Sequence, residues 1–239
     1  MNTSSTLHLL SGGAAQGLVA AVRSRFEAQA GGAGGACVIA GGFGAVGVMV
    51  ERLLAGEPCD VLIVTAALIA QLTDMNHLRE GSARALGVVK TGIAVQHGQA
   101  APQVDTPKAL EMALLAASGI YFPDPVKSTA GIHFMKVLKS LGIADEVASR
   151  LRPFPNGAAA MREMAQVSEP GAIGCTQVTE ILYTPGVKLV GLLPAKFELA
   201  TVYTAAVGAG SSVPEHAAAL VAMLSGSDTA TLRKTAGFE

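Results

Sequence analysis

The sequence has no tryptophan, and only 4% of its 239 residues are aromatic. Charged residues are also scarce, at 15%, and the formal net charge is −1. Proteins that bind nucleic acids need a basic surface, and those that bind single strands also use aromatic side chains on which bases stack. The composition therefore excludes a nucleic-acid partner and argues against binding to a charged membrane surface. Half of the residues are hydrophobic, enough for the core of a globular α/β protein.

Cysteine is rare as well. Cys37, Cys59 and Cys175 lie far apart, in or just before strand-like runs. We predict three buried thiols, with neither a disulfide framework nor a zinc site.

The five histidines show no paired spacing of the kind that metal sites use. We therefore expect neither a metal nor a cofactor. No Ser–His–Asp or Cys–His set can be argued from the sequence, because such sets are defined by contacts in space.

Long hydrophobic runs are missing too. The longest are about as long as a strand, well short of the roughly 20 residues that span a bilayer. Residues 1–5 lead into the strand-like Thr6–Leu10 without a basic segment followed by an apolar one. The expected location is therefore the cytoplasm for the chain as given, or the periplasm if a signal peptide has been removed.

Strand-like and helix-like segments alternate along the chain, which is typical of an α/β fold with open sheets covered by helices. The predicted strands are residues 7–10, 36–40, 61–65, 86–95, 120–122, 172–176, 187–192 and 200–207. Helical patterns follow most of them, including one with a stripe of Ile132, Met135, Leu138 and Leu141 that ends at Gly142. Asn156 is predicted to cap another helix, and Pro214 to begin one.

Two of the predicted strands are long enough to connect two lobes. We expect the chain to leave the first lobe near residue 91 and to return near residue 200. The predicted domains are residues 1–91 with 200–239, and residues 92–199. Ligands of such folds bind at the carboxyl ends of strands, so the expected ligand cleft lies between the lobes.

Two glycine-containing segments follow the first two predicted strands. Ser11, Gly12 and Gly13 would begin the first helix, where an anion can bind to free N–H groups; the alternative is a plain Ser N-cap. The loop Gly41–Gly47 contains Gly44, Ala45 and Val46. It does not fit a dinucleotide fingerprint, because it follows the second strand and Asp60 begins the next one.

Two further polar clusters precede later helices. Lys127, Ser128 and Thr129 supply a cation and two hydroxyls at one helix start, although a capping Ser beside a solvated Lys would also explain them. Thr176, Gln177, Thr179 and Glu180 open another helix, whose alternative interpretation is a polar surface. Four helix starts, two in each lobe, would then converge on one cleft and bind an anion.

Three long segments resemble the molybdate-binding-protein-like solute receptors, which have the class II periplasmic binding protein fold. They are FGAVGVMVERLLAGEPCDVLIVTA (43–66), FPDPVKSTAGIHFMKVLKSLGI (122–143) and VPEHAAALVAMLSGSDTATLRKTAGF (213–238). The resemblance covers nearly the whole chain and implies a two-lobe α/β fold with its ligand between the lobes.

The resemblance also indicates how the site departs from a molybdate site. Ser11 matches the first anion-binding Ser of the family, but the second falls at Val46 and the usual Tyr falls at Gln177. The cation Lys127 and its two hydroxyl neighbours replace an uncharged turn. This change suits an organic carboxylate, since Lys and hydroxyl groups pair well with carboxylates.

Two functions follow from the resemblance. One is the substrate-binding component of an ABC transporter, which would deliver molybdate, another oxyanion or a carboxylate to its membrane partner. The other is an enzyme, because aconitate isomerases resemble this receptor group and shift a double bond in a tricarboxylate. Lys127, Glu180 and His133 are the candidate proton carriers, and the altered anion donors favour a carboxylate-binding isomerase.

Overall fold

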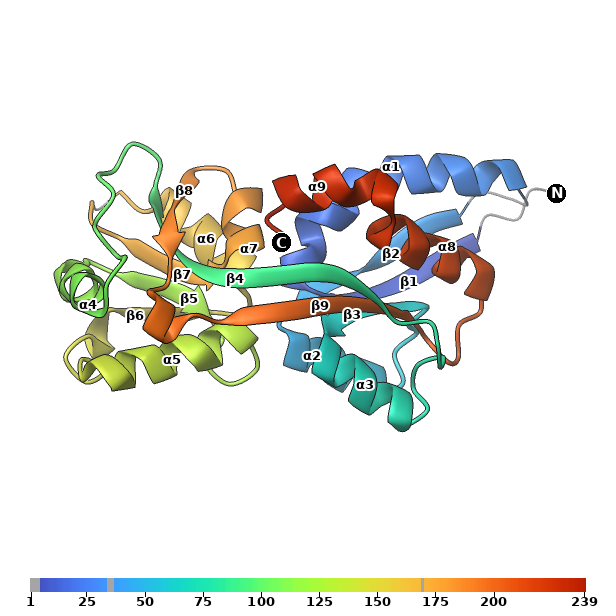
Figure 1. Cartoon of the computed structure of the whole chain (residues 1–239), viewed down its shortest axis with the longest axis horizontal. Coiled ribbons are helices and arrows are strands. Elements are labelled where there is room, and N and C mark those ends of the chain that lie inside the picture. The colour runs from blue at the N-terminus through green and yellow to red at the C-terminus, as the bar shows by residue number, and fades with distance from the viewer. Residues whose placement is uncertain (1–4, 34–36, 169) are drawn as a thin grey trace. The chain divides into compact units, whose positions relative to one another are not determined.

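The computed structural model describes residues 5–33, 37–168 and 170–239. Strands and helices alternate along the chain, as the sequence predicts (Figure 1). The chain divides into two compact units, and the strands β4 (Arg84–Gln96) and β9 (Ala200–Val207) contribute to both. Unit 1 comprises Met1–Val88 and Val202–Glu239, and unit 2 comprises Val89–Thr201.

Unit 1 is built on parallel strands. Its remaining elements are β1 (Ser5–Gly12), η1 (Gly13–Ala15), α1 (Gln16–Ala33), β2 (Cys37–Gly44), α2 (Val46–Leu54), β3 (Val61–Thr65), α3 (Ala66–Asp74), α8 (Pro214–Ser225), η4 (Ser227–Thr229) and α9 (Ala230–Thr235). Strand β1 pairs in parallel with β2 and with β3, and β9 pairs antiparallel with β3. Helices α1, α8 and α9 cover one face of this sheet and α2 and α3 the other (Figure 1). Strand β3 is buried on both faces, which explains its continuous apolar run.

Unit 2 has a mixed sheet. Its elements besides β4 are α4 (Pro107–Ala116), β5 (Ile120–Pro123), α5 (Thr129–Leu141), η2 (Ala148–Arg150), β6 (Leu151–Phe154), α6 (Gly157–Gln166), β7 (Ile173–Gln177), α7 (Val178–Tyr183), β8 (Val187–Leu192) and η3 (Ala195–Phe197). Strand β5 pairs in parallel with β6 and β7, whereas β4 pairs antiparallel with β7 and β8.

The two faces of the unit 2 sheet have separate cores, because side chains alternate along a strand. Phe122 packs with Phe134 and the rest of α4 and α5 on one face. Its neighbour Tyr121 packs with Met161 and Met164 of α6 on the other. Both helix layers are therefore held by side chains of the same short strand, β5.

Several local predictions are confirmed. Gly142 ends α5 in the left-handed conformation, with φ of 76°, and Asn156 caps α6 through a 2.8 Å hydrogen bond from the N–H of Ala159. Pro214 is the first residue of α8. The sequence analysis did not predict α3, α4 or β6. Helix α4 could have been found, because Thr106 and Pro107 form an ordinary helix start.

Two predictions need correction. The α5 stripe is displaced, because Phe134 and Val137 are buried whereas Ile132 is 36% exposed. Of the three cysteines, Cys37 and Cys175 are buried, but Cys59 is only half-buried. Cys59 precedes β3, as the sequence predicts, in an irregular segment after α2.

Candidate functional site

The carboxyl ends of β1, β2 and β3 lie at one edge of the unit 1 sheet, because these strands are parallel. Gly12 and Gly44 end neighbouring strands and are paired in register, and Thr65 ends β3. Each strand end leads into a helix start, so the N–H groups of η1, α2 and α3 gather at this edge. Such an edge is where open α/β sheets bind their ligands.

Ser11 and Gly12 belong to β1 and not to a helix. The Ser11 hydroxyl is fully buried and donates a 2.9 Å hydrogen bond to the carbonyl oxygen of Gly12. Gly12 is the N-cap of η1, which has no side-chain cap. The interpretation of Ser11 as a plain N-cap is therefore wrong. The predicted position of Ser11 at the carboxyl edge of the sheet agrees with the structure.

Val46 and Tyr203 pack closely against Gly12. A Cβ atom built on Gly12 would lie 3.0 Å from Cγ1 of Val46 and 3.2 Å from Cε1 of Tyr203. Both side chains are buried, and Tyr203 is the β9 partner of Thr65. The edge of unit 1 is therefore lined by an apolar branched side chain and a tyrosine ring. The sequence interpretation missed Tyr203, since an aromatic residue inside a strand looks like core.

Helix α2 begins without a side-chain cap. Its N-cap residue is Ala45, whose methyl side chain cannot accept a hydrogen bond from the helix N–H groups. By contrast, α4 and α6 are capped by Thr106 and Asn156. A helix start without a capping side chain presents N–H groups and positive potential to a ligand.

In unit 2 the parallel strands β5, β6 and β7 also end at one edge, and α5, α6 and α7 begin there. Asp124 fixes the turn between β5 and α5, since its Oδ1 accepts hydrogen bonds from the N–H groups of Val126 (2.7 Å) and Lys127 (2.8 Å). A Cβ atom on Gly131 would overlap the carbonyl oxygens of Pro123 and Asp124. The turn is therefore pressed against the first turn of α5, which fixes the backbone of Lys127.

The cluster that follows this turn has the expected placement at the start of α5. Ser128 is the N-cap of α5 and is buried, yet its side chain makes no capping hydrogen bond. Lys127 and Thr129 are half-buried. The alternative interpretation, in which the Ser128 hydroxyl caps α5, is therefore wrong, because this hydroxyl accepts no hydrogen bond from the helix.

His133 lies one turn into α5 and has a partner of its own. Its Nε2 is 2.8 Å from the carbonyl oxygen of Phe197 in η3. A carbonyl oxygen can only accept, so this bond requires a proton on Nε2. The bond ties α5 to η3 and occupies one ring nitrogen of His133.

Glu180 is buried, and several donors surround its carboxylate. Oε2 accepts a 2.5 Å hydrogen bond from the Thr176 hydroxyl, and the backbone of Gly157, Ala158 and Gln177 also stabilises the charged carboxylate. Burial raises the pKa of Glu180, and these hydrogen bonds oppose the rise. The sequence placed Glu180 at this edge but gave no sign of its contacts with α6.

Two buried hydroxyls at this edge lack hydrogen-bond partners within the described residues. They are Oγ1 of Thr91 and Oγ1 of Thr179. Thr91 is the β4 partner of Gln177 in the antiparallel pair, so it lies where β7 ends. A buried hydroxyl with no protein partner is a candidate for a bond to a ligand. Thr91 did not stand out in the sequence because it lies inside a long apolar strand.

Within the described residues, Cys59, Cys175 and the acidic and histidine residues form no second kind of site. Burial raises the pKa of Cys59 to about 12 and raises that of Cys175 as well, so neither thiol forms a nucleophilic thiolate at neutral pH. In the described ranges, no group of three His, Cys, Asp or Glu residues is arranged to hold a metal ion. No helix in those ranges is long and apolar enough to cross a bilayer.

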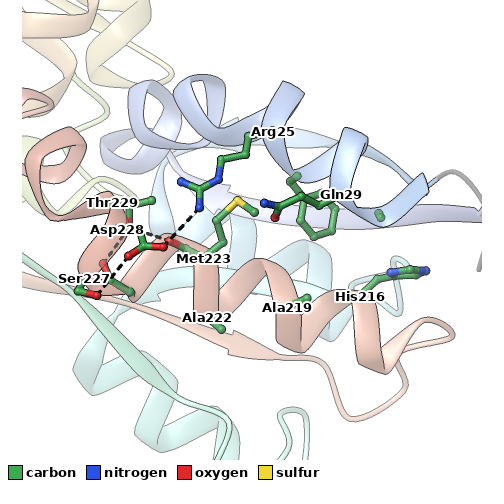
Figure 2. Close-up of a pocket in the computed structure, with 12 residues that line it drawn as sticks. Arg25, Gln29, His216, Ala219, Ala222, Met223, Ser227, Asp228 and Thr229 are labelled. Atoms are coloured by element: carbon green, nitrogen blue, oxygen red, sulfur yellow. Dashed lines mark hydrogen bonds and ion pairs between the residues drawn. The ribbon is translucent and has the colours of Figure 1, made fainter. Parts of the chain in front are cut away.

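A cavity of about 510 Å³ lies in unit 1, between α1 and α8 (Figure 2). Phe26 and Met223 give it an apolar lining, and Arg25 pairs with Asp228 at 3.5 Å at one end. His216 lies at the other end, on α8 (Figure 2). None of the predicted ligand-binding residues lines this cavity.

Solved structures with this fold are two-lobe periplasmic binding proteins. The periplasmic molybdate-binding protein of Azotobacter vinelandii is 18% identical and matches with a TM-score of 0.77 over 98% of both chains. The sulfate-binding protein SubI of Mycobacterium tuberculosis is 16% identical, with a TM-score of 0.73 over 98% of this chain and 86% of that one. These likenesses establish the class of fold.

The family follows from the sequence. The model of the bacterial extracellular solute-binding proteins matches residues 7–239, and the chain belongs to this family. A curated relative, an aconitate isomerase from a Pseudomonas species, is 27% identical over 193 residues, which are 79% of this chain and 70% of that protein.

Proposed function

We propose that the protein binds a small organic polycarboxylate through the helix starts at the carboxyl edges of its sheets. The observation that carries the proposal is the start of α5, where Lys127 is held by the Asp124 turn and Ser128 makes no capping bond. A lysine ammonium and two hydroxyls form charge-assisted hydrogen bonds with a carboxylate. Ser11, Gly12, Gly13, Gly44, Ala45, Val46, Thr176 and Gln177 complete the proposed ligand-binding set.

The packing around Gly12 supports a carboxylate over a tetrahedral oxyanion. Val46 and Tyr203 occupy the space in front of Gly12, so an apolar side chain lies where a small symmetrical oxyanion needs donors. A polycarboxylate has a carbon skeleton that can contact such a wall while its charged ends reach the helix starts. Sulfate or molybdate has no apolar part and would leave Val46 without a matching surface.

We further propose that the bound acid is isomerised by an allylic proton shift, as the aconitate isomerase relative suggests. In this reaction a base removes a proton from one carbon, the double bond moves by one position, and a proton returns to the far carbon. No oxidant or reductant is needed. Cations and helix N–H groups that hold the carboxylates would stabilise the charge that develops on them.

The three candidate proton carriers differ in their surroundings. The Glu180 carboxylate already accepts a hydrogen bond from Thr176 and is stabilised by nearby backbone groups, and Nε2 of His133 is bonded to the carbonyl oxygen of Phe197. Lys127 lies directly before the N-cap of α5 and is half-buried, and we propose it as the group that contacts the substrate directly. Its first role is to hold a carboxylate, because an ammonium group must lose its proton before it can act as a base.

A receptor that delivers an anion to an ABC transporter is the second candidate. Its support is the family itself, whose members are described as solute-binding proteins. A receptor needs the same binding groups but no proton carrier, so turnover separates the two functions and binding alone does not.

The test is a thermal-shift screen with citrate, cis-aconitate, trans-aconitate, molybdate, tungstate and sulfate. A ligand that binds only the native state raises the melting temperature. We expect a tricarboxylate to stabilise the protein and molybdate to have little effect. Stabilisation by molybdate alone would overturn the carboxylate proposal. Proton NMR of trans-aconitate with the protein then tests for conversion to the cis isomer, and stabilisation without conversion would favour the receptor.

A further inference from the structure

The first turn of α6 faces polar groups of the protein itself. The Glu180 carboxylate lies against Gly157, where a Cβ atom would overlap its Oε2, and the backbone of Gly157 and Ala158 stabilises the charged form of Glu180 and so lowers its pKa. Ala159 donates to Oδ1 of Asn156 at 2.8 Å, and Ala160 donates to the carbonyl oxygen of Asn156 at 3.0 Å. The start of α6 therefore has the donors of an anion site, and an anion from the same chain already binds them.

Glu180 reaches this position from the first turn of α7. Its carboxylate is also stabilised by the backbone of Gln177, the residue before α7, which is one half of a capping box. A further donor is the Thr176 hydroxyl. These groups surround the carboxylate with donors from the protein itself.

The backbone of α6 is shaped to admit this carboxylate. A Cβ atom on Gly157 would overlap Oε2 of Glu180 and Oγ1 of Thr176. Glycine is thus the only residue that lets the carboxylate approach the helix start so closely. Glu180 is only 5% exposed, and within the described residues it has no Lys, Arg or His ion-pair partner, so backbone donors and one hydroxyl balance its charge.

We infer that Glu180 is an internal anion that occupies the binding position at the start of α6, and that this position accepts a small monocarboxylate from solution when the Glu180 side chain is removed. The side chain joins α6 to the end of β7 and thereby positions Thr176 and Gln177. It also closes one of the three helix starts at this edge to solutes. This inference concerns unit 2 alone and does not depend on the identity of the solute.

The test is chemical rescue of Glu180→Ala by formate. Removal of the side chain leaves buried N–H groups without acceptors, so the melting temperature should fall by roughly 5 to 10 °C. Sodium formate at 100 mM should then raise the melting temperature of Glu180→Ala by about 2 to 5 °C more than sodium chloride of equal ionic strength does. The wild-type protein should show no such difference.

Three comparisons sharpen the test. Formamide has the shape of formate without its charge, and equal rescue by formamide would overturn the assignment of an anion. Gly157→Ala should be destabilised but not rescued, because its own Cβ atom fills the position. If Glu180→Ala does not accumulate as folded protein, refolding from urea should recover it in formate and not in chloride, and failure in both would count against the inference. The rescue experiment measures only how formate changes the stability of the variants. Its result can therefore be interpreted even if no polycarboxylate stabilises the wild-type protein.

Discussion

The Ser211 hydroxyl donates a 2.6 Å hydrogen bond to Oδ1 of Asp60, although the two residues are 151 positions apart. The same carboxylate accepts from the N–H groups of Ser212 (3.0 Å) and His8 (2.7 Å). Asp60 is 2% exposed. It therefore ties the loop before α8, which comes late in the chain, to the first strand.

Asp60→Ala should lower the free energy of unfolding by about 3 kcal/mol, because two buried N–H groups and a hydroxyl lose their acceptor. Urea denaturation measures the change. Asp145→Asn is the control, since Asp145 is exposed and its side chain makes no ion pair within the described residues; this variant should stay within about 0.5 kcal/mol of wild type. A similarly small effect of Asp60→Ala would show that the loop before α8 is held by other contacts.

Gly87 should not tolerate a side chain. Its φ is 141°, and a Cβ atom would lie 2.8 Å from the carbonyl oxygen of Glu239 and 3.1 Å from Cβ of Phe238. Gly87→Ala should therefore cost about 2 kcal/mol or more through strain and overlap. Gly81 has φ of 73° and open space around it, so Gly81→Ala should cost only the backbone term of about 1 kcal/mol. Equal midpoints of urea unfolding for the two variants would show that a Cβ atom at Gly87 does not clash with Phe238 and Glu239.

Glu180 should make stability depend on pH. Burial raises its pKa above the ordinary 4.5, so above that pH the native state binds more protons than the unfolded state. The free energy of unfolding of the wild type should then fall as pH rises from 4.5 through the raised pKa, relative to the Glu180→Gln variant, which does not titrate there. Urea denaturation of both proteins at a series of pH values gives the difference, and two parallel curves would disprove the shift.

Lys127→Ala should weaken binding of whichever tricarboxylate stabilises the protein by about 10- to 100-fold, since a charge-assisted hydrogen bond is lost. Calorimetric titration measures the affinity. The matched control is Lys136→Ala, an exposed lysine two turns further along α5. Affinity that is unchanged in Lys127→Ala, or equally reduced in both variants, would remove Lys127 from the site.

Thr91→Val should raise the free energy of unfolding by about 1 kcal/mol, because the buried hydroxyl has no protein partner and the methyl group has nearly the same shape. The same variant should bind the stabilising carboxylate more weakly. Thr229→Val provides the contrast, since its hydroxyl donates to the carbonyl oxygen of Met223 at 2.7 Å and accepts from Arg233 at 2.8 Å. That variant should be destabilised, and destabilisation of both would show that Thr91 has a structural partner.

The sequence was most informative where one local rule decides the structure. The continuous apolar run Val61–Thr65 is a strand with the predicted bounds, and Asn156 and Gly142 begin and end their helices as expected. These features depend on neighbours within a few residues. The helix starts at the strand ends could be predicted for the same reason.

Features that depend on distant parts of the chain were not predictable in this way. Both Ile132 and Phe134 are apolar, and only the packing of α5 against β5 decides that Phe134 faces the core. The contact of Glu180 with α6 joins segments that are more than 20 positions apart, and nothing in either segment specifies the other. Tyr203 lies beside Gly12 because β9 pairs with β3, which is a matter of topology.

The course of the chain has a consequence for biosynthesis. Unit 2 is one uninterrupted segment, Val89–Thr201, whereas unit 1 needs β9 and α8 from the last 38 residues, Val202–Glu239. A ribosome therefore releases every residue of unit 2 before unit 1 is complete. During that interval β3 lacks its antiparallel partner β9, and the face of α1 that packs on α8 remains exposed. The first unit to be started is thus the last that can close its core.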